Sequence, residues 1–454
     1  MNKNLLPLSF RASEVDRIFS TIQSGDSCLM VGIGSVGKSN LLRFLQQEDV
    51  RRAKLGPEWD KYLLIYVDAN KLLQPSAWGL YELMLHQILV GVSQQDIDIL
   101  MYEAIDALHE RSAEPATQHL ALRYLDRALS LVCSRLDFRV VFLIDEFDRL
   151  CNTLPAQTFA ALRSLRDDRK YRLMYVVAAR KDLSRLREAG NDIEDFEELV
   201  TPNTIWLVSY SEEDARHMLH RLAIRNKVKL DEECIRDVLA KTGGHPGLIR
   251  ATFPIMCERP ANMAERLVTD KRVLDECQRI WHSVSEDEQR AIENLVNKGD
   301  LHILPAEIVE RLRTMGLIGG DWAKPDEIFS SIMAEHVRQL KPAIGARIRL
   351  ERQKRIVFVD DRKTEGLAPL EYRLMELLDK RRNHVVTHDE IAEFLYSDNV
   401  KLEGVTDDAI TSVIKRLRIA IEPEVGKPQF IITVRGHGIK LVDGEITGGE
   451  ADNS

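Results

Sequence analysis

Short, continuous apolar runs alternate with amphipathic stretches through the first half of the chain. Four of these runs have the length of buried strands, and they lie within "SCLMV", "YLLIYVDAN", "RVVFLIDEFDRL" and "YRLMYVVAARKD". Stretches with helical spacing, such as "KSNLLRFLQQ", fill the intervals between them. From about residue 12 to 210 this alternation predicts an α/β fold with a doubly wound, mainly parallel sheet and right-handed crossovers. The interval from Trp78 to Arg135 is longer than a minimal crossover, and we expect it to form an inserted helical surface for a partner.

A different pattern begins near residue 343. The stretch "RIRLERQKRIVFVDD" alternates apolar and polar positions, as strands of a small antiparallel sheet do. Two amphipathic helices follow in "LAPLEYRLMELLDKRRNHVVTHDEIAEFL", and the segment "FIITVRGHGIKLV" predicts a closing hairpin that turns at Gly436 and Gly438. Between them "TDDAITSVIKRLRIAIEP" predicts a third helix, whose apolar face comprises Ile410, Val413, Ile414, Leu417 and Ile421. We therefore expect a separate C-terminal domain.

The composition restricts the class of protein. With 454 residues, 44% of them hydrophobic and 30% charged, the chain is long enough for about three globular domains. Its net charge of −9 argues against wholesale wrapping of nucleic acid, although a local basic face can still bind it. No apolar run approaches the roughly 18 residues of a membrane span, so we expect a cytoplasmic protein without a membrane partner. The six cysteines form no CxxC pair, so neither a zinc site nor a disulfide framework is indicated.

The stretch "VGIGSVGKSNLL" fits the pattern GxxxxGK[ST] between a predicted strand and a predicted helix. In that context successive backbone N–H groups curl around phosphate oxygens at a helix N-terminus. We expect Lys38 to reach the β- and γ-phosphates of ATP or ADP and Ser39 to bind Mg²⁺. The predicted nucleotide-binding residues of this loop are Gly32, Gly34, Gly37, Lys38, Ser39 and Asn40.

Acidic and basic side chains follow two of the other predicted strands. Asp145 and Glu146 end the apolar run of "RVVFLIDEFDRL". We expect Asp145 to serve the Mg²⁺ and Glu146 to polarise the attacking water as a general base. Arg180 ends the fourth strand, where the carboxyl ends of parallel strands meet a ligand, so it is a candidate γ-phosphate sensor. No arginine finger is assigned among the candidates Arg163, Arg166, Arg169, Arg185 and Arg187.

Over residues 8–340 the chain resembles the STAND branch of P-loop ATPases, which is related to AAA+ proteins and includes NACHT and apoptotic-ATPase regulators. "FRASEVDRIF" is similar to the family's lead-in segment near adenine and places Arg11 there, without the family's glycine. "KTGGHPGLIRATF" resembles the GxP motif, which places His245 and Pro246 beside the nucleotide. From the residues alone, the same "GGHP" is a flexible loop with a proline that starts a helix. The resemblance implies slow, regulatory ATP hydrolysis, and a switch in which ADP holds a closed monomer and ATP permits homo-oligomerisation.

After the helical lid, "IWHSVSEDEQRAIENLV" and "LPAEIVERLRTMGLIGG" are similar to the winged helix that the same family uses more often as an intramolecular latch than as a DNA reader. Residues 346–442 resemble the OmpR-type winged-helix domain of bacterial response regulators. The matching stretches are "PLEYRLMELL", "IKRLR" and "ITVRGHGIKL", with Ile439 where that family prefers tyrosine. This resemblance implies that the third helix enters the DNA major groove. The implied DNA-binding residues are Thr411, Ser412 and Lys415 for base edges and Arg416, Arg418 and Arg435 for phosphates.

The expected order of domains follows from these boundaries and resemblances. It comprises a P-loop ATPase core (1–210), a helical lid (211–270), a central winged helix (271–343), an OmpR-type winged-helix domain (344–443) and a disordered tail (444–454). The segment before the OmpR-type domain is the ATPase and not a phospho-acceptor receiver, so control is expected to come from the nucleotide.

Three functions are compatible with this organisation. The first is a nucleotide-switched regulator of transcription that binds DNA through its C-terminal domain. The second is a bacterial defence or signalling ATPase scaffold whose winged helix docks an effector protein. Ile419 and Ala420, where the OmpR family often has basic residues, together with Asp407 and Asp408 at the helix start, keep this reading open. The third, a DNA-remodelling or loading ATPase, requires an unambiguous arginine finger, which the sequence does not display.

Overall fold

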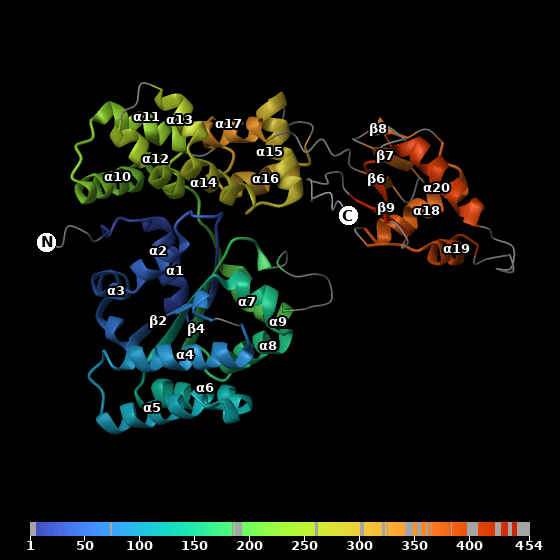
Figure 1. Cartoon of the computed structure of the whole chain (residues 1–454). Coiled ribbons are helices and arrows are strands. Elements are labelled where there is room, and N and C mark those ends of the chain that lie inside the picture. Colours follow the sequence, from blue (N-terminus) through green and yellow to red (C-terminus); the bar gives the residue numbers. More distant parts are fainter. Residues whose placement is uncertain are drawn as a thin grey trace, which may run out of the picture. The chain divides into compact units, whose positions relative to one another are not determined.

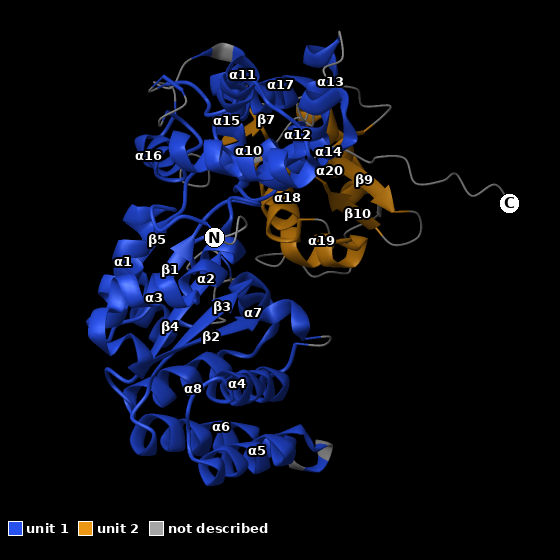
Figure 2. Ribbon diagram, turned by 90° about the vertical axis from the view of Figure 1, so that its left-hand side faces the viewer, with its two compact units in different colours: residues 1–339 blue, residues 340–454 orange. Residues whose placement is uncertain are grey.

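In a computed structural model the chain forms two compact units, residues 1–339 and 340–454 (Figure 2). The described residues are 6–72, 75–183, 186, 193–258, 262–299, 304–319, 323–324, 326–340, 348–351, 356–359, 362–364, 366–382, 384–396, 407–422, 428–434 and 438–442. Among these residues, no helix has both the length and the apolar character needed to cross a bilayer.

The first unit is built on a five-stranded sheet in which every pairing between the described strands is parallel. Its strands are β1 (Cys28–Val31), β2 (Tyr62–Asp68), β3 (Arg139–Asp145), β4 (Leu173–Ala179) and β5 (Thr204–Trp206), in the order β2-β3-β4-β1-β5. The doubly wound, mainly parallel sheet predicted from the apolar runs is thus confirmed. In this order β4 lies between β1 and β3, so the segments that follow these three strands emerge side by side at one edge of the sheet.

Helices cover the sheet as the alternating pattern predicts (Figure 1). They are α1 (Ala12–Gln23), α2 (Lys38–Leu45), α3 (Glu48–Leu55), α7 (Phe147–Thr153), α8 (Ala156–Asp167) and α9 (Glu194–Val200). The strands are buried along almost their whole length, and Phe196 of α9 packs against Tyr175 of β4, which in turn stacks on Phe142 of β3. Because both faces of the sheet are covered, the strands are continuous apolar runs and not alternating ones.

The long interval between β2 and β3 folds into an extra helical layer. It contains α4 (Ala77–Val92), α5 (Ile99–Ala113) and α6 (Ala121–Ser130), followed by a π-helical turn at Leu131–Arg135. Helix α4 packs on the sheet, and α5 and α6 lie outside it (Figure 1). At the start of α5, Ile99 and Leu100 are 64% and 65% exposed. The role of this layer as a partner surface stays a prediction.

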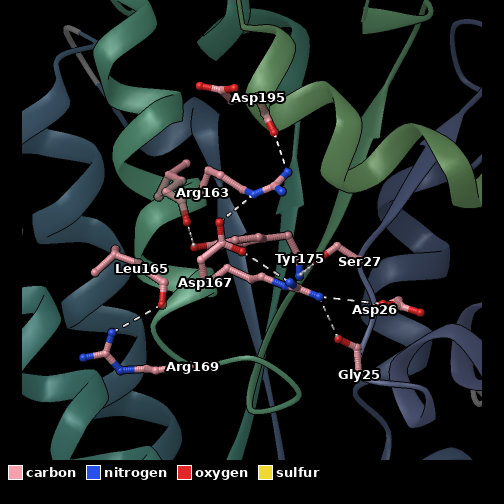
Figure 3. A network of polar contacts seen from close by, with 11 residues as sticks. Gly25, Asp26, Ser27, Arg163, Leu165, Asp167, Arg169, Tyr175 and Asp195 are labelled. Carbon is pink, nitrogen blue, oxygen red and sulfur yellow. Dashed lines mark hydrogen bonds and ion pairs between the residues drawn. The ribbon is translucent and has the colours of Figure 1, made fainter.

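At the amino end of the strands, arginines of α8 and the following turn form a network of polar contacts (Figure 3). Arg163 donates to Asp167 and to the carbonyl oxygen of Asp195. The guanidinium of Arg166 lies 3.7 Å from the carboxylate of Asp26. Arg169 forms an ion pair with Asp126, which the figure does not label. These three candidate fingers are therefore engaged within their own chain, while Arg185 and Arg187 lie outside the described residues.

The rest of the first unit is helical. It comprises α10 (Glu212–Asn226), α11 (Glu232–Thr242), α12 (Pro246–Glu258), α13 (Met263–Thr269), α14 (Lys271–Trp281), α15 (Glu286–Lys298), α16 (Ala306–Thr314) and α17 (Ser331–Gln339). Local sequence sets several helix starts, since Ser211 and Asp231 accept backbone N–H bonds as N-caps. Ser285 and Glu288 form a capping box at the start of α15. An antiparallel bridge between Ile318 and Ile328 precedes α17.

The second unit has the predicted order of sheet, three helices and hairpin. Strands β6 (Ile348–Glu351), β7 (Ile356–Val359) and β8 (Arg362–Lys363) form an antiparallel sheet, and β9 (Ile431–Val434) pairs with β10 (Gly438–Leu441). The helices are α18 (Pro369–Lys380), α19 (His388–Tyr396) and α20 (Asp407–Ile421). All five residues of the predicted apolar face of α20 are buried. Gly438 has a φ of 134°, and a Cβ there would lie 2.1 Å from the Val386 carbonyl oxygen, whereas Gly436 lies outside the described residues.

Candidate nucleotide site

The glycine-rich loop joins the end of β1 to the start of α2. The N–H group of Gly32 donates to the carbonyl oxygen of Ala179 at 3.1 Å, which ties the loop to the neighbouring strand β4. Gly37 has a φ of 104°, in the region that favours glycine, and a Cβ there would lie 3.0 Å from the Tyr210 hydroxyl. This residue lets the backbone turn directly into α2, which begins at Lys38.

Lys38 is 7% exposed, and its ammonium group is folded back onto the loop. Its Nζ donates to the carbonyl oxygens of Gly32 at 2.6 Å and Ile33 at 3.2 Å. Burial lowers the pKa of Lys38 to about 8, and the carboxylates of Asp148 and Glu146 partly oppose that shift. Neutral carbonyl oxygens compensate a buried cation less well than an anion does, so the site favours an anionic ligand beside Lys38.

The acidic pair lies at the end of β3, two strands away from β1. Asp145 is 2% exposed, and its Oδ1 accepts the backbone N–H of Glu146 at 3.0 Å. Its Oδ2 accepts the Tyr66 hydroxyl at 2.7 Å, and burial together with Asp145 raises the pKa of Tyr66, which keeps this phenol a donor. Glu146 has a φ of 53°, so the chain turns sharply there before α7 begins.

Arg180 follows β4 and therefore emerges between the loop and the acidic pair. Its guanidinium donates to Glu146 Oε2 at 2.8 Å. Its backbone N–H donates to both carboxylate oxygens of Asp148, at 2.8 and 3.0 Å. Asp148 thus fixes the backbone from which Arg180 reaches Glu146.

The two segments assigned through the STAND resemblance pack against the same loop. Arg11 is buried with a φ of 46°, and its guanidinium donates to the carbonyl oxygens of Val36 at 2.9 Å and Val208 at 2.8 Å. The guanidinium also lies 4.7 Å from the centre of the Tyr210 ring. Arg11 therefore joins the N-terminal segment, the loop and the segment after β5.

His245 and Pro246 connect the helical part of the unit to the loop. His245 is fully buried; its Nδ1 accepts the backbone N–H of Leu248 at 3.3 Å, and its Nε2 lies 3.0 Å from the Gly34 carbonyl oxygen. Because Nδ1 is the acceptor, the proton is on Nε2, which donates to Gly34. Burial lowers the pKa of His245 to about 3, so the ring is neutral. Pro246 is buried at the first position of α12.

A cavity of about 690 Å³ opens above the loop. It is lined by several of the predicted residues, namely Gly34, Gly37, Lys38, Ser39, Asn40, Glu146 and Arg180. The other predicted residues of the first unit are not among its lining residues: Gly32, Arg11, Asp145, His245 and Pro246. The structure thus brings the loop, the carboxylate and the arginine to one cavity, and places the remaining side chains around it.

The opposite wall of the cavity comes from helices that sequence reasoning missed. Its residues are Arg250 of α12, Asp275, Gln278 and Arg279 of α14, and His282 and Ser283 after α14. A Cβ at Gly34 would lie 2.9 Å from the carbonyl oxygen of Arg279, so α14 contacts the loop directly. Arg250 could have been found, because it follows Pro246 by one helical turn. The residues of α14 belong to no local motif, and tertiary packing alone brings them to the loop.

The chemistry of the donor set fits Mg²⁺. The described residues contain no cluster of three or more His, Cys, Asp or Glu side chains that could hold a metal. Mg²⁺ does not need such a cluster, because it binds through one or two protein oxygens, substrate phosphates and water. The hydroxyl of Ser39 and the carboxylate of Asp145 are hard oxygen donors of that kind, and they would hold the ion.

In the second unit, α20 presents the predicted DNA-contacting face. Thr411, Ser412, Lys415 and Arg416 are exposed, and Arg416 lies 3.4 Å from the Glu371 carboxylate. Arg418 has a different environment from the one expected, because its guanidinium donates to the Ile431 carbonyl oxygen and to Thr433 of β9. It therefore joins α20 to the hairpin. Arg435 lies outside the described residues.

Comparison with known families bears on this second unit. Residues 362–441 match the family model described as "Transcriptional regulatory protein, C terminal". This segment is an OmpR-type winged helix. The chain is 28% identical over 96 residues to the transcriptional regulatory protein CutR of Streptomyces coelicolor, covering 21% of this chain and 41% of CutR. It is 33% identical over 85 residues to the alkaline phosphatase synthesis transcriptional regulatory protein SphR of Synechococcus elongatus, covering 19% of this chain and 32% of SphR. The chain thus spans about two fifths or less of the length of these relatives.

Similar solved structures include the Walker-type ATPase paby2304 of Pyrococcus abyssi, with a TM-score of 0.44 and 17% identity over 74% of this chain and 100% of that chain. The ORC2 protein of Aeropyrum pernix has a TM-score of 0.42 and 14% identity over 72% of this chain and 93% of that chain. The P-loop fold of the first unit is evident from its own sheet order and glycine-rich loop.

Proposed function

We propose that the protein is a nucleotide-controlled regulator of transcription, in which a slow ATPase switch of the STAND type governs DNA binding by the C-terminal winged helix. The observation that carries this proposal is the joining of two parts on one chain. A cavity lined by a P-loop, two carboxylates and several cations lies in the first unit, and an OmpR-type winged helix forms the second.

The residues of the cavity divide into binding and catalytic roles. The loop amides and Lys38 would bind the β- and γ-phosphates of ATP, with Arg250 and Arg279 as further cations on the opposite wall. Ser39 and Asp145 would hold Mg²⁺, which supplies charge neutralisation at the phosphates when it is bound. Glu146 would accept the proton of the attacking water.

Arg180 gives a reason for slow hydrolysis. The Arg180 guanidinium donates to Glu146 Oε2 at 2.8 Å and so engages an oxygen that would otherwise accept the proton of the attacking water. A γ-phosphate is a competing anion for the same guanidinium, and the 52% exposure of the Arg180 side chain leaves it free to turn toward that anion. Binding of the γ-phosphate would therefore draw Arg180 away from Glu146 and release this carboxylate to act as the base.

The switch requires that ATP and ADP differ in their contacts with the helical part of the unit. A ligand shifts a conformational equilibrium only by its differential affinity for the two states. Helix α14 contacts the loop and lines the cavity, so a γ-phosphate would meet it directly. We infer that ATP favours self-assembly, which raises the avidity of individually weak winged helices for repeated DNA half-sites.

One observation favours a second candidate, the effector-docking scaffold. Two of the predicted phosphate contacts of α20 are engaged within the domain, Arg416 with Glu371 and Arg418 with β9. Fewer free cations on this face weaken non-specific attraction to DNA. A protein partner would then take the place of DNA, under the same nucleotide control.

The nucleotide half of the proposal is tested by titrating a fluorescent ATP analogue into the purified chain and into the Lys38→Ala variant. We expect the wild type to bind and Lys38→Ala to lose binding, because no other buried ammonium among the described residues reaches the loop. Lys54→Ala, which removes an ammonium paired with Asp16 outside the cavity, is the matched control and should bind as the wild type does. Equal binding by wild type and Lys38→Ala would contradict the assignment.

A further inference from the structure

A chain of hydrogen bonds links helix α2 to strands β2 and β3. Arg43 of α2 donates to the Tyr66 hydroxyl of β2 at 3.2 Å, and that hydroxyl donates to Asp145 Oδ2 of β3 at 2.7 Å. The Arg43 guanidinium also lies over the Tyr66 ring, 5.0 Å from its centre. Neither Arg43 nor Tyr66 belongs to the P-loop or to the acidic pair.

The direction of the chain is determined by its donors. A guanidinium can only donate, so the Tyr66 oxygen must accept from Arg43. A phenol has a single proton, and here that proton points at Asp145. The other oxygen of the carboxylate accepts the Glu146 backbone N–H at 3.0 Å. Two donors, the Tyr66 hydroxyl of β2 and the backbone N–H of the next residue, thus fix the rotation of a carboxylate that is only 2% exposed.

The positions of these residues connect the chain to both predicted ligands of Mg²⁺. Arg43 lies four residues after Ser39 on α2, so the two side chains share one face of that helix. Helix α2 therefore carries one predicted ligand and, through Arg43 and Tyr66, fixes the orientation of the other. Groups that hold ligands in this way commonly change metal affinity by roughly 10–100-fold when they are removed.

We propose that Tyr66 is a positioning residue for the magnesium–nucleotide complex, because its hydroxyl fixes the orientation of the Asp145 carboxylate that would serve the ion. This inference rests on the proposed nucleotide binding. It concerns the contribution of Mg²⁺ to affinity and leaves the metal-free contacts of the phosphates with Lys38 and the loop unchanged.

The test is a titration of a fluorescent ATP analogue, first in EDTA and then with increasing Mg²⁺, for the full chain and three variants. Tyr66→Phe removes only the hydroxyl and retains the ring beneath Arg43. Arg43→Met removes the donor to Tyr66 without altering β2. Tyr62→Phe is the matched control, because its hydroxyl lies on the same strand and accepts from Arg139 at 2.7 Å, away from Asp145.

We expect all four proteins to bind the analogue equally in EDTA. The Mg²⁺ concentration at half-saturation should rise about tenfold in Tyr66→Phe, less in Arg43→Met, and not at all in Tyr62→Phe. A Tyr66→Phe titration that matches the wild type, an equal shift in Tyr62→Phe, or loss of binding by Tyr66→Phe in EDTA would each overturn the positioning role. A wild type that does not bind the analogue in either condition would instead overturn the proposed nucleotide site.

Discussion

At the scale of single residues, the cavity is organised by backbone groups and by a few fixed charges. Asp148 accepts the backbone N–H of Arg180, and His245 donates to the Gly34 carbonyl oxygen. The ammonium group of Lys38 donates to the Gly32 carbonyl oxygen of the loop. Each of these contacts joins the loop or its neighbourhood to a different element. The site is therefore preorganised, which is the condition under which fixed charges stabilise a transition state best.

The first prediction at this scale concerns the general base. Glu146→Gln should retain ATP binding, because the loop and Lys38 are untouched, while hydrolysis slows by roughly 10²–10⁴-fold. The readout is release of inorganic phosphate under single-turnover conditions, with binding of the fluorescent analogue measured alongside. Glu213→Gln is a matched control, because that carboxylate accepts a hydrogen bond from Ser9 and is not among the residues lining the cavity. Phosphate release by Glu146→Gln at the wild-type rate would remove Glu146 from the chemistry.

The second prediction concerns pH and His245. Its pKa is lowered from 6.5 to about 3 by burial, so between these values the unfolded chain takes up a proton that the folded chain does not. The contribution of the neutral ring to stability is therefore complete above about pH 6.5 and is lost as the pH falls toward 3. At pH 5 the loss amounts to about 2 kcal/mol. Urea unfolding followed by tryptophan fluorescence at pH 7.5 and 5 measures it.

His245→Gln is the comparison for that measurement, because an amide can donate to Gly34 without titrating. The variant should lose less stability than the wild type between pH 7.5 and 5. An equal loss in the two proteins would show that other groups carry the pH dependence.

At the scale of helices and strands, charged side chains join α20 to the β9–β10 hairpin in the second unit. Glu422, which follows α20, is buried and accepts the backbone N–H groups of Gln429, Phe430 and Ile431 at the start of β9. Arg418 of α20 binds the carbonyl oxygen of Ile431 from the same side. Side chains at the C-terminal end of α20 therefore bind both N–H and C=O groups of the hairpin backbone and hold the hairpin in place.

This arrangement gives a prediction about local stability. Glu422→Ala would leave three backbone N–H groups without their acceptor and should destabilise the second unit by about 2–4 kcal/mol. Hydrogen exchange of the full chain, read by mass spectrometry, should show faster exchange over β9 and β10 and no change in the sheet of the first unit. Glu393→Ala, at an exposed position of α19, is the control. Unchanged protection of β9 in Glu422→Ala would contradict the role of this carboxylate.

The same scale shows how far the sequence predicts the site. The loop, the acidic pair and Arg180 could be found because each directly follows an apolar strand, and parallel strands bring their carboxyl ends to one edge. The wall from α14 could not be found, because Asp275, Gln278 and Arg279 reach the loop only through packing between helices. The helical face of Arg418 is visible in the sequence and predicts a phosphate contact, whereas the hydrogen bond to Ile431 depends on how β9 packs against α20, which no local pattern shows.

At the scale of the whole molecule, the chain joins a P-loop unit to an OmpR-type winged helix, each with its own core. Isolated winged helices with few free cations bind DNA weakly at physiological salt. Assembly of several copies would compensate by avidity, and we propose that ATP promotes this step. The nucleotide would thus control occupancy of repeated sites, and the recognition of each site would depend on α20.

The most direct test of this account is recovery of fragmented genomic DNA by the purified chain at about 150 mM salt, loaded with ADP or with a slowly hydrolysed ATP analogue. We predict enrichment of a defined sequence, stronger with the ATP analogue, and loss of that enrichment in Lys415→Glu, which inverts an exposed charge of α20. Lys324→Glu, the same change at an exposed position of the first unit, should enrich DNA as the wild type does. Absence of enrichment in both nucleotide states would contradict transcriptional control and favour the effector-docking scaffold.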